Sequence, residues 1–162
     1  MSISDETLEG FINNEKPRLM KILKALGIDL GGSCVVDVGA EVGLSAQMFK
    51  ELGAQCVIGY DINETYCRNR LNVFDEYYCR EMTIEEYLNY IDKGYFIKFD
   101  CEGCEEKYIK VKLPSRGLIC LHDWVNGHND LAYMLIDNDF IPVFHSYDWR
   151  EICYLKAQAK RI

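Results

Sequence analysis

Short runs of apolar, β-branched and aromatic residues alternate along the chain with segments whose apolar residues recur every three or four positions. The runs predict strands, and the recurring positions predict amphipathic helices. The predicted strands cover residues 34–39, 56–61, 73–79, 95–100, 117–123, 140–147 and 151–158. The predicted helices cover residues 17–27, 44–53, 62–71, 83–91, 102–113 and 131–139.

Strands that alternate with helices are typical of an α/β fold with a parallel sheet. The last two strands follow one another directly, so we expect an antiparallel hairpin at the edge of the sheet. A chain of 162 residues is long enough for one domain with a substantial core. We therefore expect a single domain over residues 1–162, with an N-terminal helical segment at 1–30 and the sheet with its flanking helices at 31–162.

The carboxyl ends of four predicted strands carry an aspartate: Asp37, Asp61, Asp100 and Asp123. In open α/β sheets, ligands bind beyond the carboxyl ends of the strands. The sequence therefore predicts a ligand site at this edge of the sheet.

The turn after the first strand reads DVGAEVGLSA and begins at Asp37. Its glycines allow a tight bend and the close approach of a ligand. A dinucleotide fingerprint would need glycine at Glu41 and glycine or alanine at Leu44, and neither is present. Carboxylates at Asp37 and Glu41 would repel a pyrophosphate. They suit the ammonium and sulfonium groups of S-adenosylmethionine. Asp61 would accept hydrogen bonds from the ribose hydroxyls of this cofactor. The alternative is a glycine turn that binds no ligand.

This stretch resembles motif I of class I S-adenosylmethionine-dependent methyltransferases, in which an acid precedes a G-x-G-like turn. A second segment, IKFDCEGCE, is similar to the K-I-D-V-E-G-A-E signature of the FkbM-type methyltransferase family. TIEEYL, at residues 83–88, looks like the T-L-D-D-L-L segment of that family, and the resemblance covers residues 35–110. The signature matches at Lys98, Asp100, Glu102, Gly103 and Glu105, while Cys101 and Cys104 stand in place of small apolar residues.

The resemblance implies a Rossmann-like class I methyltransferase sandwich, with a mostly parallel sheet and an antiparallel C-terminal hairpin, that binds S-adenosylmethionine. For Glu102 and Glu105, complementing the dipole of the following helix is an alternative role. The predicted cofactor-binding residues are Asp37, Gly39, Ala40, Glu41, Gly43, Asp61, Ile62 and Asp100. The predicted catalytic residues are Asp100, Glu102, His122 and Asp123.

The segment GLICLHDW, which ends at Trp124, is closer to the G-x-I-x-x-H-D segment of another branch of class I methyltransferases. Members of that branch include enzymes that bind a divalent metal through acids at strand ends. Asp100 and Asp123 could do so with Asn126, since oxygen ligands suit magnesium or calcium. A divalent metal is therefore possible but not favoured, and capping the loop is the alternative role of Asp123.

Two histidines, His122 and His128, are candidate general bases toward a hydroxyl acceptor, although a lone histidine commonly has a structural role. Three aromatic residues, Tyr60, Trp124 and Trp149, could line the adenine or acceptor pocket or pack in the core.

Eight cysteines are many for a chain of this length. We expect Cys101 and Cys104 to be packing substitutions, because a structural zinc needs four ligands and the chain has no second CxxC or histidine pair. A redox pair and intracellular disulfides remain alternatives. Inside an apolar run, a thiol behaves as a small buried hydrophobe. Four cysteines lie in such runs: Cys34, Cys56, Cys120 and Cys153.

The net charge of −8 argues against broad nucleic-acid binding, which relies on basic residues. No apolar run approaches the roughly 20 residues that span a bilayer, and the acidic N-terminus resembles no targeting signal, so we expect a cytoplasmic protein without a membrane partner. The predicted function is S-adenosylmethionine-dependent O-methylation of a small-molecule or glycan hydroxyl. A non-catalytic binding module of the same fold and an NAD(P)-dependent reductase are the alternatives, and the oligomeric state stays open.

Overall fold

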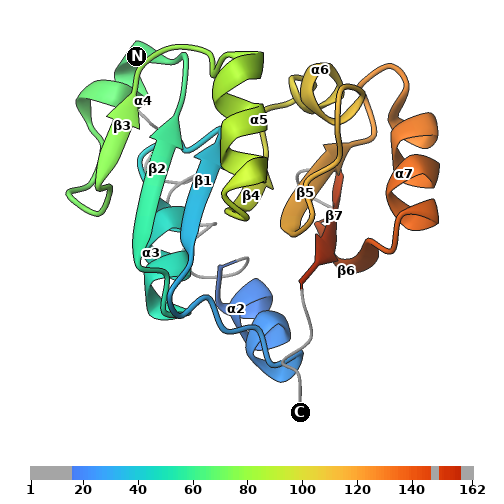
Figure 1. Ribbon diagram of the computed structural model, residues 1–162, viewed down its shortest axis with the longest axis horizontal. Coiled ribbons are helices and arrows are strands. Elements are labelled where there is room, and N and C mark those ends of the chain that lie inside the picture. The colour runs from blue at the N-terminus through green and yellow to red at the C-terminus, as the bar shows by residue number, and fades with distance from the viewer. Residues whose placement is uncertain (1–15, 147–149, 158–162) are drawn as a thin grey trace. The chain divides into compact units, whose positions relative to one another are not determined.

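The computed structural model describes residues 16–146 and 150–157, and contacts divide the chain into two compact units, Met1–Thr83 and Ile84–Ile162 (Figure 1). Because a compact unit is not by itself an independently folding domain, the expected single domain stays a prediction. The first unit contains α2 (Lys16–Ala25), β1 (Cys34–Val38), α3 (Leu44–Glu51), β2 (Cys56–Tyr60), α4 (Glu64–Arg68) and β3 (Glu76–Tyr78).

The strands of the first unit are parallel and lie in the order β3-β2-β1, side by side in Figure 1. Their apolar positions form the core: Val35, Val36 and Val57 are fully buried. Helix α2 adds Leu23, and Gly27 follows it with the left-handed φ of 70° that favours glycine after a helix. The predicted helices and strands of this half are therefore confirmed, with ends shifted by a few residues.

The second unit contains α5 (Ile84–Asp92), β4 (Phe96–Phe99), α6 (Glu105–Ile109), β5 (Gly117–His122), α7 (His128–Asp137), β6 (Ile141–Ser146) and β7 (Glu151–Lys156). Its strands lie in the order β4-β5-β7-β6, with β4 parallel to β5 and β7 antiparallel to both β5 and β6. The predicted antiparallel C-terminal hairpin is confirmed. Pro142 lies in β6, the outermost strand of this order, where a missing N–H is tolerated.

Helix α6 begins at Glu105, although the sequence predicts a start near Glu102. Glu102 and Gly103 have φ values of 55° and 116°, which are incompatible with a right-handed helix. The segment CEGC is therefore a turn that precedes the helix. Trp149 lies outside the described residues.

All eight cysteines are paired, which corrects the expectation that Cys101 and Cys104 only pack and selects the alternative of disulfides. The reason for the error is that a run of apolar neighbours reveals burial, whereas pairing depends on which strands lie next to each other. Two of the bonds join residues directly opposite one another in β1–β2 and β5–β7. The four disulfides are Cys34–Cys56, Cys67–Cys79, Cys101–Cys104 and Cys120–Cys153.

In residues 16–146 and 150–157, no helix combines the length and the apolar character that crossing a bilayer requires.

Candidate functional site

The turn after β1 uses the left-handed backbone three times in five residues. The φ angles are 76° at Gly39, 48° at Glu41 and 108° at Gly43. A side chain at Gly43 would also collide with the ring of Phe74, because its Cβ would lie 2.8 Å from Phe74 Cε2. Glu41 breaks the dinucleotide fingerprint, yet its backbone has the conformation that glycine normally adopts.

Asp61 joins the end of β2 to this turn. Its Oδ2 accepts the N–H of Glu41 at 2.9 Å, and its Oδ1 accepts the N–H of Asn63 at 2.8 Å. Asn63 caps the N-terminus of α4, since its side chain accepts the N–H of Thr65 at 2.9 Å. A carboxylate oxygen can accept two hydrogen bonds, so Asp61 retains acceptor capacity for a ligand. The next residue, Ile62, is 70% exposed.

Tyr77 fixes the same turn from β3. Its hydroxyl donates to the carbonyl oxygen of Glu41 at 2.9 Å. Burial, followed by the charges of Asp61 and Asp37, raises the pKa of Tyr77 well above its ordinary value, so the phenol remains a donor. No motif in the sequence points to Tyr77. The available signal was Gly59 inside β2, where a Cβ would lie 2.8 Å from Tyr77 Cδ2.

Two of the predicted cofactor residues lie in the interior. Asp37 is fully buried within β1, which continues to Val38, so the prediction that it ends the strand is wrong by one residue. Ala40 is also fully buried, and its N–H donates to the carbonyl of Tyr60 at 3.0 Å. Within the first unit, Asp61, Ile62 and the exposed Glu41 are therefore the side chains best placed for a ligand.

In the second unit, Asp100, His122 and Glu151 form a cluster with potential ligand atoms within 4.8 Å of one another. His122 Nε2 lies 3.3 Å from Glu151 Oε2 and 3.7 Å from Asp100 Oδ1. Only Asp100 is appreciably accessible, with 31% of its side chain exposed against 4% for His122. His122 is therefore almost fully buried, and Asp100 is the member of the cluster that solvent can reach.

Glu151 was missed because it lies in the predicted hairpin, far from any recognised motif. It faces His122 directly in the β5–β7 pairing. Placing the predicted hairpin beside the fifth strand in that register would have brought the two residues together.

Asp123, a predicted catalytic residue and a possible metal ligand, pairs instead with Arg150. The guanidinium Nε lies 2.9 Å from Oδ1 and 3.1 Å from Oδ2. Among the described residues, no cluster with metal-ligand spacing includes Asp123. The structure therefore does not bring Asp123 and Asp100 together in such a cluster.

His128 lies at the start of α7 and lines a surface hollow of about 470 Å³ formed by residues 123 and 125–130. Its Nδ1 is 3.0 Å from the carbonyl oxygen of His122, which can only accept. Nδ1 therefore carries the hydrogen and Nε2 carries a lone pair that can take up a proton. The ring of Trp124, which is 46% exposed, is tilted by 42° to the His122 ring, with centroids 4.4 Å apart.

Two acids of the CEGC turn and the start of α6 have opposite environments. Glu102 is exposed, whereas Glu105 is fully buried and accepts the N–H of Gly103 at 2.9 Å. Burial raises the pKa of Glu105, and the nearby charges of Asp100 and Glu102 raise it further, while the hydrogen bond from Gly103 opposes both. The carboxyl of Glu105 therefore holds its proton to higher pH than an ordinary glutamate.

Replacing Glu105 with glutamine is expected to flatten the pH dependence of stability. The pKa of Glu105 is raised in the folded state above its ordinary value of 4.5, so the folded state binds more protons and stability falls as pH rises through this window. Glutamine cannot ionise, yet it can still accept the Gly103 N–H. Urea midpoints measured from about pH 4 to about pH 8 test this. Glu106→Gln is the control, because Glu106 pairs with Lys110 at the surface; equal slopes in the two variants would contradict the expectation.

Solved methyltransferase structures resemble the chain over most of its length. The Mtq2–Trm112 complex of E. cuniculi, responsible for methylation of the eRF1 translation termination factor, gives a TM-score of 0.57 at 11% identity, covering 88% of this chain and 93% of that one. A candidate caffeoyl-CoA O-methyltransferase from Staphylococcus aureus gives 0.61 at 15% identity, with 96% and 93% covered. M. capricolum TrmK with bound S-adenosyl-homocysteine gives 0.54 at 11% identity, with 83% and 66% covered.

These likenesses confirm the predicted Rossmann-like fold of class I methyltransferases. No protein-family model matches the chain, so the FkbM resemblance stays a prediction.

Two viral proteins are similar in sequence. Uncharacterized protein 158B of Sulfolobus islandicus rod-shaped virus 1 is 28% identical over 141 residues, covering 80% of this chain and 84% of the relative. Uncharacterized protein 65 of Sulfolobus islandicus filamentous virus (isolate Iceland/Hveragerdi) is 30% identical over 136 residues, with the same 80% and 84% covered. At this identity and coverage, the chain belongs to the same family as protein 65 of the filamentous virus.

Proposed function

We propose that the protein is an S-adenosylmethionine-dependent methyltransferase. The observation that carries the proposal is the 2.9 Å bond from the Glu41 N–H to Asp61 Oδ2, which joins the end of β2 to the glycine turn after β1. In open α/β folds, an acid placed in this way holds the ribose of a nucleotide-type ligand. The methyltransferase fold of the chain supports the same assignment.

Residues of the first unit fit the cofactor in four ways. The remaining acceptor positions of Asp61 suit ribose hydroxyls. The exposed side chain of Ile62 offers an apolar surface to the adenine ring. The carboxylate of Glu41 suits a cationic group, and the bare backbone at Gly39 permits close approach.

When bound, S-adenosylmethionine supplies a methyl group on a positively charged sulfur. The protein must orient the acceptor and exclude water. Asp100 and His128 are the candidates for receiving the proton of an acceptor hydroxyl, since each is accessible and has a group that can accept. His122 and Glu151 would hold Asp100 in place.

We propose a small-molecule or glycan hydroxyl as the acceptor, as an FkbM-type enzyme would use. The hollow of about 470 Å³ beside His128 supports this choice, since pockets for small ligands have similar volumes. The net charge of −8 disfavours a polyanionic acceptor such as RNA.

Calorimetric titration with S-adenosylmethionine, NAD and NADP tests the assignment. Binding of S-adenosylmethionine, followed by release of S-adenosyl-homocysteine when a hydroxyl acceptor is present, is the expected result. Binding without turnover by any acceptor would favour a non-catalytic module of the same fold. Binding of NAD or NADP alone would favour a reductase and overturn the proposal.

Replacing Ile62 with aspartate is expected to weaken S-adenosylmethionine binding about 10-fold or more, because an apolar contact with adenine is lost and a charge must be desolvated. The matched control is Ile141→Asp, since Ile141 is also an exposed isoleucine, at 51%, but lies on the outermost strand β6 of the second unit. Equal dissociation constants for the two variants would place the adenine elsewhere.

A further inference from the structure

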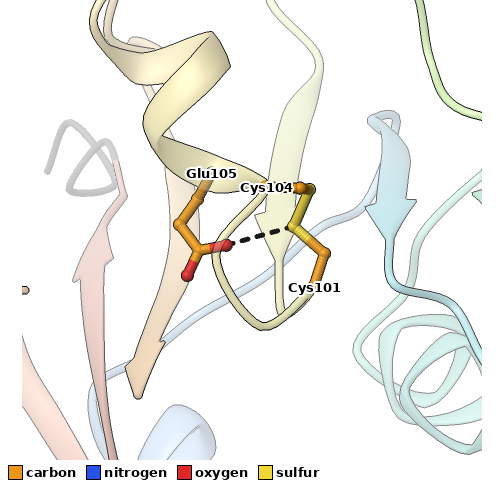
Figure 2. Close-up of side chains that lie close together, drawn as sticks. All are labelled: Cys101, Cys104 and Glu105. Atoms are coloured by element: carbon orange, nitrogen blue, oxygen red, sulfur yellow. Dashed lines mark hydrogen bonds between the residues drawn. A yellow bond between two sulfur atoms is a disulfide. The ribbon is translucent and has the colours of Figure 1, made fainter. Parts of the chain in front are cut away.

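The Cys101–Cys104 disulfide closes a small ring in the turn between β4 and α6 (Figure 2). The two cysteines are three residues apart in sequence, with Cα atoms 5.4 Å apart, and both are half-buried. The other three disulfides join residues 12, 22 and 33 apart and connect separate segments of their units. Opening Cys101–Cys104 therefore separates no element from another, whereas opening any of the others removes a cross-link between two segments.

The carboxyl of Glu105 lies against this bond. Figure 2 shows the side chain reaching from the first turn of α6 to the sulfur of Cys101, with Oε2 3.1 Å from Sγ. A disulfide sulfur has no hydrogen to donate, so this contact becomes an S–H···O hydrogen bond only after reduction. Glu105 is fully buried, and its Oε1 has no hydrogen-bond partner among the described residues. Because burial raises its pKa, the carboxyl can hold a proton beside the sulfur.

The other three disulfides do not combine exposure to solvent with a neighbouring carboxyl group in this way. Cys120–Cys153 forms a cluster with Glu151, but Cys120 and Cys153 are only 3% and 1% exposed. The remaining two, Cys34–Cys56 and Cys67–Cys79, belong to no such cluster with a carboxylate in the part of the chain that the structure describes.

We propose that Cys101–Cys104 is a thiol–disulfide exchange site that accepts electrons from a low-molecular-weight thiol, with Glu105 as its proton donor. The thiolate of the reductant attacks Cys104 Sγ and forms a mixed disulfide. The Cys101–Cys104 bond breaks, its electron pair goes to Cys101 Sγ, and Glu105 Oε2 delivers the proton. The exchange reaction does not require the proposed methyl transfer.

A second thiolate then attacks the reductant sulfur of the mixed disulfide. Cys104 leaves as a thiolate and takes a proton from water, and Glu105 regains its proton from solvent. In total, one protein disulfide is reduced to two thiols, and two reductant thiols are oxidised to one disulfide. Reoxidation by a small disulfide follows the same steps in reverse, with Glu105 taking the proton from Cys101.

The ring also constrains the backbone beside Asp100. Glu102 keeps the left-handed φ of 55° inside the closed ring, a conformation that costs a residue other than glycine free energy. Reduction removes the covalent restraint and allows Glu102 to leave this conformation. The exchange site therefore couples the redox state of the turn to its backbone conformation.

The test is the rate at which reduced glutathione opens each disulfide in the intact protein, followed by alkylation of the new thiols and peptide mass spectrometry. Cys101–Cys104 is expected to open first, before the Cys67–Cys79 bond, in which Cys79 is exposed and Cys67 is buried. Glu105→Gln is expected to slow this opening about 10-fold or more, while Glu106→Gln leaves it unchanged. After correction for the thiolate fraction of glutathione, the wild-type rate is expected to fall as pH rises and Glu105 ionises, and the Glu105→Gln rate to stay constant.

Opening of Cys101–Cys104 no faster than Cys67–Cys79 would overturn the exchange site. Equal rates in the Glu105→Gln and Glu106→Gln proteins would overturn the role of Glu105. The wild-type pH profile requires no substitution, so a flat corrected profile would contradict the proton donor even if a variant failed to fold.

Discussion

Replacing both Cys120 and Cys153 with alanine is expected to lower the free energy of unfolding by about 2–5 kcal/mol. The bond closes a loop between residues 33 apart in sequence, and long loops gain the most from a cross-link in the unfolded chain. Both residues are almost fully buried in neighbouring strands of the second unit, so the substitution also leaves small voids where the sulfurs were. Urea unfolding followed by circular dichroism under non-reducing conditions measures the change.

The matched control is the double replacement of Cys101 and Cys104 with alanine. That bond closes a ring between residues only three apart, so the loss is expected to stay within about 1.5 kcal/mol. If the two double variants lose equal free energy of unfolding, the stability that the Cys120–Cys153 bond provides does not come from closing a long loop.

Replacing Asp61 with alanine is expected to weaken S-adenosylmethionine binding by about 1–3 kcal/mol, or roughly 5- to 150-fold in the dissociation constant. The variant loses the acceptor for ribose hydroxyls. It also loses the bonds to the N–H groups of Glu41 and Asn63, so the glycine turn is no longer fixed to the end of β2. Isothermal titration calorimetry on the folded variant measures the loss.

Asp75→Ala is the control for Asp61. Asp75 also accepts a backbone N–H, from Val57 at 2.7 Å, and it pairs with Lys50 at 2.8 Å. The bond with Lys50 and the bond from Val57 lower the pKa of Asp75. Val57 lies near the start of β2, whereas Asp61 follows the end of that strand. A loss of affinity in Asp75→Ala as large as in Asp61→Ala would show that the effect comes from general loosening of the unit.

The positions that the sequence predicted well are those determined by local pattern. Asp61 and Asp100 directly follow β2 and β4, because a strand of apolar residues ends where the chain turns polar. The cap at Asn63 and the stop at Gly27 were also predictable, because each depends on the backbone of its own neighbours.

The features that the sequence did not reveal depend on pairing between distant segments. Glu151 meets His122, and Arg150 meets Asp123, only because β7 lies antiparallel to β5. Tyr77 reaches Glu41 only because β3 lies beside β2. No spacing in the sequence encodes these registers.

The Cys34–Cys56 and Cys120–Cys153 bonds each connect residues that face one another on neighbouring strands. A strand that slips by one residue along its neighbour turns its inward side chains outward, and a bond between facing residues forbids that slip. When the chain is denatured with these bonds intact, one pair of facing residues in each unit therefore stays joined in the native register. Refolding then begins with one β1–β2 contact and one β5–β7 contact already formed. Contacts between residues far apart in sequence make β-sheet proteins slow to fold, because the chain must search for them.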